Sequence, residues 1–189
     1  MEYVFRYSSP LGGITLASDG VSLNGLWFDG QKYFAKTLDR EHECKRLPVF
    51  EHTAMWLDIY FSGKDPGFIP QLSMKTTPFR REVWEIMLSI PYGQTMTYGE
   101  IAKQIAAQKG LAGMSAQAVG GAVGHNAISL IIPCHRVVGA NGSLTGYAGG
   151  IEKKMQLLCM EGVQSGSREV PKKGFTLPDA HEETGRKEI

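Results

Sequence analysis

The sequence predicts a small α/β domain at the N-terminus, followed by a mainly α-helical domain. In the first third of the chain, short apolar segments alternate with turns rich in Gly, Pro and Ser, a pattern typical of strands. In the rest, apolar residues recur every three or four positions behind residues that cap helices. A chain of 189 residues is long enough for two small domains with cores of their own. We expect residues 1–75 to form the first domain, residues 76–165 the second, and residues 166–189 a charged, mobile tail.

The first domain is expected to hold a small antiparallel sheet and one helix. The expected strands are residues 3–7, 14–17 and 23–28, separated by turns at residues 8–13 and 19–20. A helix over residues 48–62 follows, and its apolar stripe is Phe50, Ala54, Leu57 and Phe61. Residues 63–70 are rich in Gly and Pro, so they are expected to link the two domains.

The second domain opens with a helix that is marked at both ends. Thr77 can cap it, Pro78 suits its first position, and Pro91-Tyr92-Gly93 ends it. Its expected buried face is Phe79, Val83, Ile86, Met87 and Ile90. Thr97 and Glu100 then have the spacing of a capping box, which predicts a second helix.

Ser115 can cap a third helix, SAQAVGGAVG, which carries almost no side-chain bulk. Helix, short turn, helix is the arrangement of a helix-turn-helix DNA reader, although bare helix pairs are far commoner. Two adjacent glycines each cost about 1 kcal/mol in a helix interior, so they need a reason. One reason is close packing against another helix. The other is entry into the minor groove, which is about 6 Å wide against roughly 10–12 Å for an ordinary helix.

A cysteine and a histidine are adjacent at positions 134 and 135, directly after an apolar run. We expect residues 128–132 to form a strand that ends at Pro133, since proline cannot continue a ladder. Thiols react as thiolates, and an adjacent imidazole can lower the pKa of a thiol toward neutrality. By spacing alone such a pair is more often structural than catalytic, so both interpretations stay open at this point.

A turn, a loop and a helix follow the Cys-His pair. Asn141-Gly142 predicts a tight turn, and residues 145–150 a flexible loop. The helix ends at Gly162, and its expected inward face is Ile151, Met155, Leu158 and Cys159. Cys159 is therefore expected in the core, where a free thiol packs like a small hydrophobic side chain.

Composition and charge limit the partners and the compartment. A net charge of +1 gives no general basicity, so any DNA contact must come from a local surface. No apolar stretch approaches the roughly 18 residues of a membrane span, and the N-terminus lacks the pattern of a signal peptide. Three cysteines, an odd number without framework spacing, favour a reducing compartment. We expect a cytoplasmic protein that binds no membrane.

Several segments together carry a resemblance to a known family. They are Tyr98, AVGGAVGHN from Ala118 to Asn126, IIPCHRVVG from Ile131 to Gly139, LTGYAGG from Leu144 to Gly150, and Glu161-Gly162. In this order and spacing they closely resemble the O6-alkylguanine-DNA alkyltransferases, also called methylated-DNA–protein-cysteine methyltransferases. The resemblance covers the second domain almost entirely, and SPLGGITLASDG in the first domain fits the bacterial members.

The resemblance implies a fold and a reaction. The fold is a ribonuclease H-like first domain and a second domain with a winged helix-turn-helix. The reaction is direct-reversal DNA repair: a monomer binds the minor groove, flips the damaged base out, and takes the alkyl group from O6-alkylguanine irreversibly, once per molecule. O4-alkylthymine is a further candidate substrate. The resemblance implies no cofactor, because guanine is the leaving group of a single displacement.

The resemblance also implies roles for individual residues. Cys134 matches the acceptor thiol, His135 the base that acts on it through a water, and Glu161 the carboxylate that orients this base. Asn126 matches the hinge next to the groove-binding helix, and Tyr98 the residue that helps expel the base and protonates the departing guanine. The expected substrate pocket is Pro133, Tyr147, Ala148 and Gly149, and the expected DNA-binding residues are Tyr98, Ser115, Ala116, Gln117, Ala118 and Gly120.

This chain departs from the family pattern in one position and lacks an optional feature. Gln117 stands where the family usually has an arginine that fills the gap left by the flipped base; we expect Gln117 to take the same place with less electrostatic assistance. Some members hold a structural zinc in the first domain. Here a lone Cys44 with His42 and His52 lacks the usual ligand spacing, so we expect no metal.

Three alternative functions differ from alkyl transfer in the residues that they need. A non-catalytic sensor of alkylated bases would lack the acceptor cysteine, which is present as Cys134. A Cys-His hydrolase would need an oxyanion hole, and none is evident in the sequence. A transcriptional regulator would need base-reading side chains on its second helix, and SAQAVGGAVG has nearly none.

Overall fold

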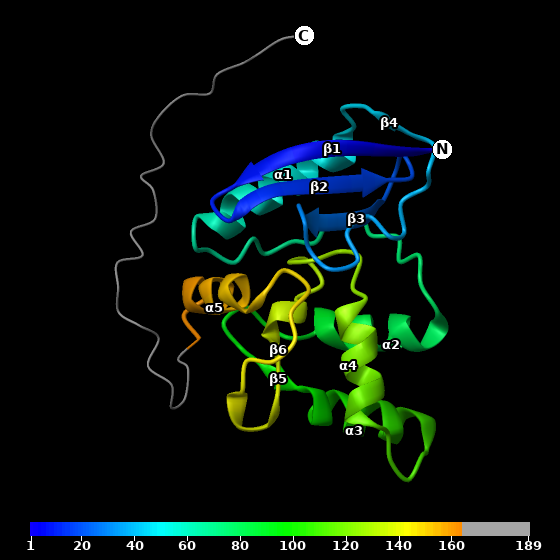
Figure 1. Cartoon of the computed structure of the whole chain (residues 1–189), viewed down its shortest axis with the longest axis vertical. Coiled ribbons are helices and arrows are strands. Elements are labelled where there is room, and N and C mark those ends of the chain that lie inside the picture. Colours follow the sequence, from blue (N-terminus) through cyan, green and yellow to red (C-terminus); the bar gives the residue numbers. More distant parts are fainter. Residues whose placement is uncertain (164–189) are drawn as a thin grey trace.

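A computed structural model describes residues 1–163 of the chain. The expected tail at residues 166–189 and the last two positions of the expected second domain lie outside the described residues. Figure 1 shows a sheet with one long helix packed against it at one end of the molecule, and a group of shorter helices at the other end. The expected boundary near residue 75 stays a prediction.

The sheet has the strand order β3-β2-β1-β4. Its strands are β1 (Glu2–Ser9), β2 (Gly12–Ser18), β3 (Leu23–Phe28) and β4 (His42–Cys44). The first three pair antiparallel, as expected, whereas β4 pairs with β1 in parallel. The sequence did not predict β4, because its three residues are all exposed and show no apolar alternation.

Helix α1 (Pro48–Phe61) covers the sheet and also faces the second domain. The expected helix over residues 48–62 is confirmed, with Phe50, Leu57 and Phe61 buried and Ala54 half-buried. Residues 63–75 form no helix or strand beyond a single bridge, in which Leu23 exchanges backbone hydrogen bonds with Gln71 and Ser73, both at 2.8 Å.

The three expected helix caps of the second domain are confirmed. The helices are α2 (Pro78–Leu88), α3 (Tyr98–Lys109) and α4 (Ala116–Gly124). Thr77 caps α2, Thr97 forms a complete capping box with Glu100 on α3, and Ser115 caps α4. Both α2 and α3 pack against α4. Trp84 of α2 donates a hydrogen bond to the carbonyl of Ala122 at 3.0 Å, which fixes the buried side of α4.

The expected strand over residues 128–132 is wrong. The segment forms a buried turn in which Leu130 takes a left-handed conformation (φ 68°), and only Ile128 makes a bridge, to Leu26 of β3. The side chain of Asn126 holds this turn: its Oδ1 accepts from Ile128 N at 3.0 Å and its Nδ2 donates to Ile132 O at 2.7 Å. An apolar run shows that a segment is buried, but its periodicity does not tell a strand from a turn sealed by a side-chain amide.

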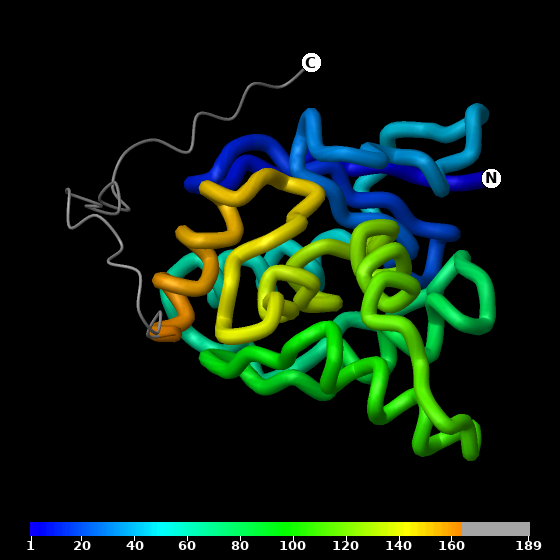
Figure 2. The backbone as a smooth tube through the Cα atoms, turned by 60° about the horizontal axis from the view of Figure 1, so that its bottom comes forward, coloured from blue at the N-terminus to red at the C-terminus, as the bar shows by residue number. Residues whose placement is uncertain are grey.

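The remaining elements connect the Cys-His pair to the rest of the domain. They are β5 (Met96–Thr97), the 3₁₀ turn η1 (Cys134–Arg136), β6 (Val137–Val138), the 3₁₀ turn η2 (Ala140–Gly142) and α5 (Ile151–Met160). The tight turn at Asn141-Gly142 is confirmed, since both residues have positive φ. Figure 2 shows the chain from β6 into α5, in yellow to orange, passing beside the first-domain strands.

The inward face expected for α5 is only partly right. Leu158 is buried and Met155 half-buried, but Cys159 and Ile151 are exposed, and the buried residues of the helix are Lys154, Leu157 and Leu158. The cause is Lys154, whose Nζ donates to the carbonyls of Val137 at 2.6 Å and Thr145 at 3.0 Å. These two hydrogen bonds offset the cost of burying the ammonium group, so the helix turns Lys154 inward instead of its purely apolar face. Within residues 1–163 no helix is long and apolar enough to cross a membrane.

Candidate active site

Cys134 lies in the interior, at the start of η1, where the buried turn over residues 128–132 ends. Its side chain is packed away from solvent and the residue is 3% exposed. Pro133 precedes it with φ −81° and ψ 68°, so it ends the buried turn and not the strand that was expected. The following strand β6 pairs with β5, which leads directly into Tyr98 at the start of α3. The local chain path therefore places the thiol near the start of α3.

His135 points away from solvent and binds Glu161. Its Nε2 lies 2.6 Å from Glu161 Oε1, and the hydroxyl of Tyr60 lies 3.2 Å from the same Nε2 and donates to Glu161 Oε1 at 2.7 Å. A nitrogen lone pair and a carboxylate oxygen would repel at 2.6 Å, so Nε2 carries the proton. His135 Nδ1 is then the basic nitrogen, and it is buried without a hydrogen-bond partner among residues 1–163.

Glu161 is the most heavily hydrogen-bonded carboxylate of this site. Besides His135 and Tyr60, it accepts from Arg136 Nε at 2.8 Å, Arg136 Nη2 at 3.2 Å and Gly93 N at 3.2 Å. Burial opposes ionisation, but the hydrogen bonds from His135 and Arg136 and the charge of Arg136 lower the pKa of Glu161 to about 2. The carboxylate is therefore ionised at neutral pH.

His135 is neutral at neutral pH. Burial lowers its pKa below the ordinary value, the partnership with Glu161 works against this, and the positive charges of Arg136 and Lys154 add to the lowering. A neutral imidazole with its proton on Nε2 has a free electron pair on Nδ1. The neutral imidazole of His135 can therefore accept a proton directly at Nδ1.

The resting thiol of Cys134 is protonated. Burial raises its pKa, while a hydrogen bond from Asn126 and the charge of Lys154 act in the opposite direction. The neighbouring imidazole does not lower the pKa by charge, because His135 is itself neutral. Activation of this thiol requires a base at the moment of reaction rather than a standing thiolate.

Lys154 places a cation within the same interior. Its side chain is fully buried, and burial lowers its pKa to about 8 while the neighbouring Cys134 works against that lowering. Its two carbonyl acceptors, Val137 and Thr145, belong to the strand after the Cys-His-Arg turn and to the expected pocket loop. Lys154 thus ties that loop to the segment that carries the thiol.

The expected pocket residues of the loop lie beside Tyr98 and Cys134. The Tyr98 hydroxyl donates to the carbonyls of Thr145 at 3.2 Å and Gly146 at 3.3 Å, and burial together with Cys134 raises its pKa.

Tyr147 has a buried hydroxyl with no partner in the described part of the chain. Burial first, with the negative charge of Glu161, places its pKa well above the ordinary value. A Cβ at Gly149 would lie 2.7 Å from the Tyr147 ring, so this glycine is needed for the ring's position. Ala148 O accepts from Lys32 N of the first domain at 2.9 Å.

Helix α4 presents its small residues outward. Ser115, Ala116, Gln117 and Ala118 are exposed, and Gly120 is half-buried. A Cβ at Gly120 would lie 3.9 Å from the Tyr98 ring, whereas a Cβ at Gly121 or Gly124 would meet nothing within 4 Å among residues 1–163. Close packing against another helix within residues 1–163 therefore does not account for Gly121 and Gly124.

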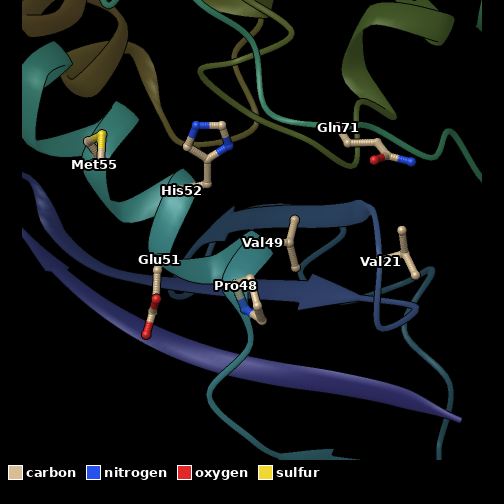
Figure 3. Close-up of a pocket in the computed structure, with 7 residues that line it drawn as sticks. All are labelled: Val21, Pro48, Val49, Glu51, His52, Met55 and Gln71. Carbon is tan, nitrogen blue, oxygen red and sulfur yellow. The ribbon is translucent and has the colours of Figure 1, made fainter.

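The residues weighed for zinc do not form a site. His42 and Cys44 are exposed on β4, and His52 stacks on Phe68 with ring centroids 4.9 Å apart. In the part of the chain that the structure describes, no three His, Cys, Asp or Glu side chains are placed to hold a metal ion. Figure 3 shows the pocket at His52, whose lining contains none of the expected catalytic or DNA-binding residues: Val21, Pro48, Val49, Glu51, His52, Met55 and Gln71.

Three residues of the site were not singled out from the sequence. Arg136 stands within the IIPCHRVVG segment, so its position next to His135 was a usable signal. Lys154 was detectable only as a polar residue on an otherwise apolar helix face. Tyr60 gave no signal, because an aromatic residue on the buried side of α1 is expected in any core.

The comparisons with known proteins agree over both parts of the chain. Residues 3–71 match the family model of the 6-O-methylguanine DNA methyltransferase ribonuclease-like domain, and residues 78–163 match that of its DNA-binding domain. The chain is 44% identical over 153 residues to the methylated-DNA–protein-cysteine methyltransferase of Mycobacterium tuberculosis, covering 81% of this chain and 88% of that protein. It is 39% identical over 161 residues to the enzyme of the same name from Haemophilus influenzae, covering 84% and 86%.

A solved structure agrees with these matches. The structure of Mycobacterium tuberculosis OGT in complex with DNA superimposes with a TM-score of 0.73 at 42% identity, covering 84% of this chain and 92% of that one. Both family models and the close relatives thus span the fold and the Cys134 site described above. The chain belongs to the 6-O-methylguanine DNA methyltransferase family.

Proposed function

We propose that this chain repairs alkylated DNA by direct reversal, as a methylated-DNA–protein-cysteine S-methyltransferase that uses Cys134 as the acceptor. The observation that carries the proposal is a buried, protonated thiol adjacent in sequence to a neutral imidazole whose other nitrogen is bound to an ionised carboxylate. This is the nucleophile, base and orienting group that nucleophilic displacement requires.

The proposed reaction is one displacement. The Cys134 proton passes through a water to His135 Nδ1, and Glu161 stabilises the imidazolium that forms. The thiolate attacks the alkyl carbon on guanine O6, so that an S–C bond forms and the O–C bond breaks. The Tyr98 hydroxyl, kept protonated by its raised pKa, donates its proton to the departing guanine, and the proton taken up by His135 then returns to the Tyr98 oxygen, so that the net change is one proton moved from the thiol to guanine. The thioether is stable, so each molecule reacts once.

The partner is double-stranded DNA containing O6-alkylguanine, bound by a monomer through the minor groove. Helices α3 and α4 are the two helices of the winged helix-turn-helix, and the exposed small residues of α4 are what permits entry into a narrow groove. Ser115, Ala116, Ala118 and Gly120 approach the groove, and Gln117 takes the place of the flipped nucleotide. Flipping costs a few kcal/mol, which binding in the groove offsets.

The flipped base enters the interior between two segments. Pro133 bounds one side, and Tyr147, Ala148 and Gly149 bound the other, with backbone groups that face the base edge. Asn126 links α4 to this pocket, since its side chain holds the turn that leads to Cys134. Its contribution to the reaction is to fix the position of the thiol.

Intact-protein and peptide mass spectrometry tests the proposal directly. After incubation with a duplex that contains one O6-methylguanine, we expect one methylene increment on the Cys134 peptide, saturating at one per molecule. Cys134→Ser should bind the duplex without gaining mass, and Cys159→Ser, at an exposed cysteine, should react like the wild type. An increment on Cys44 or Cys159 instead, or none from folded reduced protein, would contradict the assignment.

A further inference from the structure

Tyr60 brings a first-domain hydroxyl into contact with both partners of the His135–Glu161 pair. The residue is fully buried, comes from α1, and is 75 positions from His135 and 101 from Glu161 in sequence. Its hydroxyl donates to Glu161 Oε1 at 2.7 Å and lies 3.2 Å from His135 Nε2. The Glu161 carboxylate, which already binds Arg136 and Gly93, thus accepts a further hydrogen bond from a residue of the first domain.

We propose that Tyr60 is a positioning residue for alkyl transfer, in addition to the roles assigned under the proposed function, on which this inference rests. Because the hydroxyl proton is held by Glu161 Oε1, the tyrosine oxygen can only accept from Nε2–H. This arrangement favours the tautomer in which Nδ1 is the base. It also removes part of the negative charge that would otherwise stabilise an imidazolium, and so contributes to keeping His135 neutral at rest.

The contact also makes the base depend on the first domain. Tyr60 packs edge-on against His135, with ring centroids 6.2 Å apart, and stacks on Trp56 of the same helix. Burial, with Glu161, raises the pKa of Tyr60 well above its ordinary value, so the hydroxyl remains a donor throughout the working pH range. The first domain therefore contributes to the chemistry and not only to stability.

Tyr60→Phe tests this role, with Tyr7→Phe as the matched control. Tyr7 also donates to a carboxylate, Asp58 of α1, at 2.6 Å, but on the exposed side of the helix. We expect Tyr60→Phe to slow single-turnover transfer about tenfold, since hydrogen bonds to charged groups contribute about 1.5–3 kcal/mol. Loss of this donor leaves Glu161 more negative, which raises the pKa of His135, so the acid limb of the pH–rate profile moves to higher pH. Tyr7→Phe should change neither.

The pH profile separates positioning from structure. A Tyr60→Phe protein with the wild-type rate, or with a reduced rate and an unmoved acid limb, would overturn the role. Failure of the proposed function itself has a different signature, since the wild type would then leave Cys134 unmodified in the mass-spectrometric experiment.

A second inference concerns a different place, the far end of α4. The helix AQAVGGAVG has no charged side chain, yet the minor groove that it is proposed to enter is bordered by phosphates. Gln117 and Gly121 are exposed on one side of the helix, and the half-buried His125, directly after the helix, continues this line at four-residue spacing, a length of about 12 Å along the axis or three to four base pairs. Positive charge that could contact these phosphates must therefore come from elements next to α4.

The first domain supplies cations at the His125 end. Tyr33 stacks on His125 with ring centroids 4.2 Å apart and an interplanar angle of 17°. Lys32 Nζ and Lys36 Nζ lie 5.0 and 5.2 Å from the centroid of the Tyr33 ring, and both lysines are exposed. The backbone of Lys32 is bound to Ala148 of the pocket loop. We call Lys32, Tyr33, Lys36 and His125 the Tyr33 surface.

We propose that the Tyr33 surface binds phosphates of the DNA that α4 engages, an inference that rests on the proposed function. The stack fixes the loop against the end of α4, so the two ammonium groups extend the uncharged helix with positive charge. The contact is to the backbone of the duplex, so it carries affinity and its salt dependence rather than sequence preference.

The salt dependence of binding to an undamaged duplex tests the Tyr33 surface. For K32Q/K36Q we expect weaker binding, and a slope of log K against log salt that is shallower by about 1.8, which is 0.9 for each lost phosphate contact. Lys45→Gln is the control, since its Nζ lies 5.2 Å from the centroid of the Tyr3 ring, beside β4. An unchanged slope in K32Q/K36Q, or an equal change in Lys45→Gln, would overturn the proposal. Single-turnover transfer by the wild type is measured in parallel. If the wild type repairs DNA but K32Q/K36Q leaves the slope unchanged, the Tyr33 surface is rejected and the proposed function is not.

Discussion

Tyr98 and Lys154 donate hydrogen bonds to the same backbone carbonyl, that of Thr145, at 3.2 and 3.0 Å. The first residue of α3 and a buried residue of α5 are thereby joined through the loop that is proposed to close the pocket. Because Lys154 also binds Val137 O, the loop is connected to the strand that follows the thiol turn. The pocket loop is thus held by the Lys154 ammonium group together with the Tyr98 hydroxyl.

Lys154→Met should slow alkyl transfer more at neutral than at alkaline pH. The substitution removes a positive charge that lowers the pKa of Cys134 and leaves two buried carbonyls without their donor. A single-turnover pH–rate profile measures the effect. Lys153→Met is the neighbouring control, and equal rates for Lys154→Met and the wild type would exclude Lys154 from the site.

His135→Gln should slow transfer about 100-fold or more, the usual contribution of general base catalysis. The neutral imidazole that takes the thiol proton is lost, so the acid limb of the pH–rate profile should disappear and the rate should rise with pH as the thiol itself ionises. His52→Gln, at an exposed histidine of α1, serves as the control. A profile unchanged by His135→Gln would remove this residue from the mechanism.

Glu161 predicts a loss of stability in acid. Its pKa is about 2 in the fold against an ordinary 4.5, so the unfolded chain takes up a proton first as the pH falls. The stabilisation is complete above about pH 4.5, and is lost as the pH falls through 2; 2.5 pKa units correspond to about 3 kcal/mol. Urea unfolding at pH 6, 4 and 3 measures this loss. Glu161→Gln should be less stable at pH 6 and show a flatter pH dependence, and an equally steep one would assign the loss to other groups.

Gly121→Leu should leave the fold intact and abolish DNA binding. A Cβ at this position meets nothing within 4 Å in the described residues, and replacing glycine inside a helix stabilises it by several tenths of a kcal/mol. The same side chain would widen the face that is proposed to enter the minor groove. Thermal unfolding and fluorescence anisotropy with a duplex measure the two effects separately. Unchanged DNA affinity at an unchanged or raised melting temperature would place the DNA on another face.

Gln117 predicts two effects of opposite sign. Gln117→Ala should reduce the repair rate and duplex affinity, because nothing then fills the gap left by the flipped base. Gln117→Arg should raise duplex affinity, since the exposed position gains a cation that can reach phosphates or the orphaned cytosine. Anisotropy and single-turnover transfer measure both variants. A Gln117→Ala protein that binds and repairs like the wild type would end the role of this residue.

The local signals of the sequence predicted the helices well, because capping depends on residues three positions apart. Thr77, Thr97 and Ser115 each cap the helix expected of them. The strand over residues 128–132 could not be predicted correctly, since its conformation is set by the amide of Asn126 and by β3, which is about a hundred residues earlier. Long-range polar contacts of this kind produce no periodic pattern in the sequence.

The candidate site was predictable only where its members are close in sequence. Cys134, His135 and Arg136 are consecutive, and the resemblance supplied Glu161, Tyr98 and Asn126. Two further partners of the site, Tyr60 and Lys154, come from helices that were interpreted by their apolar faces. For Cys159 the same reasoning gave the wrong answer, because one buried ammonium group outweighs a single thiol in orienting α5.

The two residue pairs between β5 and β6 couple the start of α3 to the segment that follows Cys134. Met96 pairs with Val137 and Thr97 with Val138, so the residue before Tyr98 is bonded to the strand that begins three positions after Cys134. Any displacement that DNA imposes on the start of α3 is transmitted to the turn that holds the thiol. The turn that holds Cys134 and the start of α3, which carries Tyr98, are therefore coupled directly through the backbone.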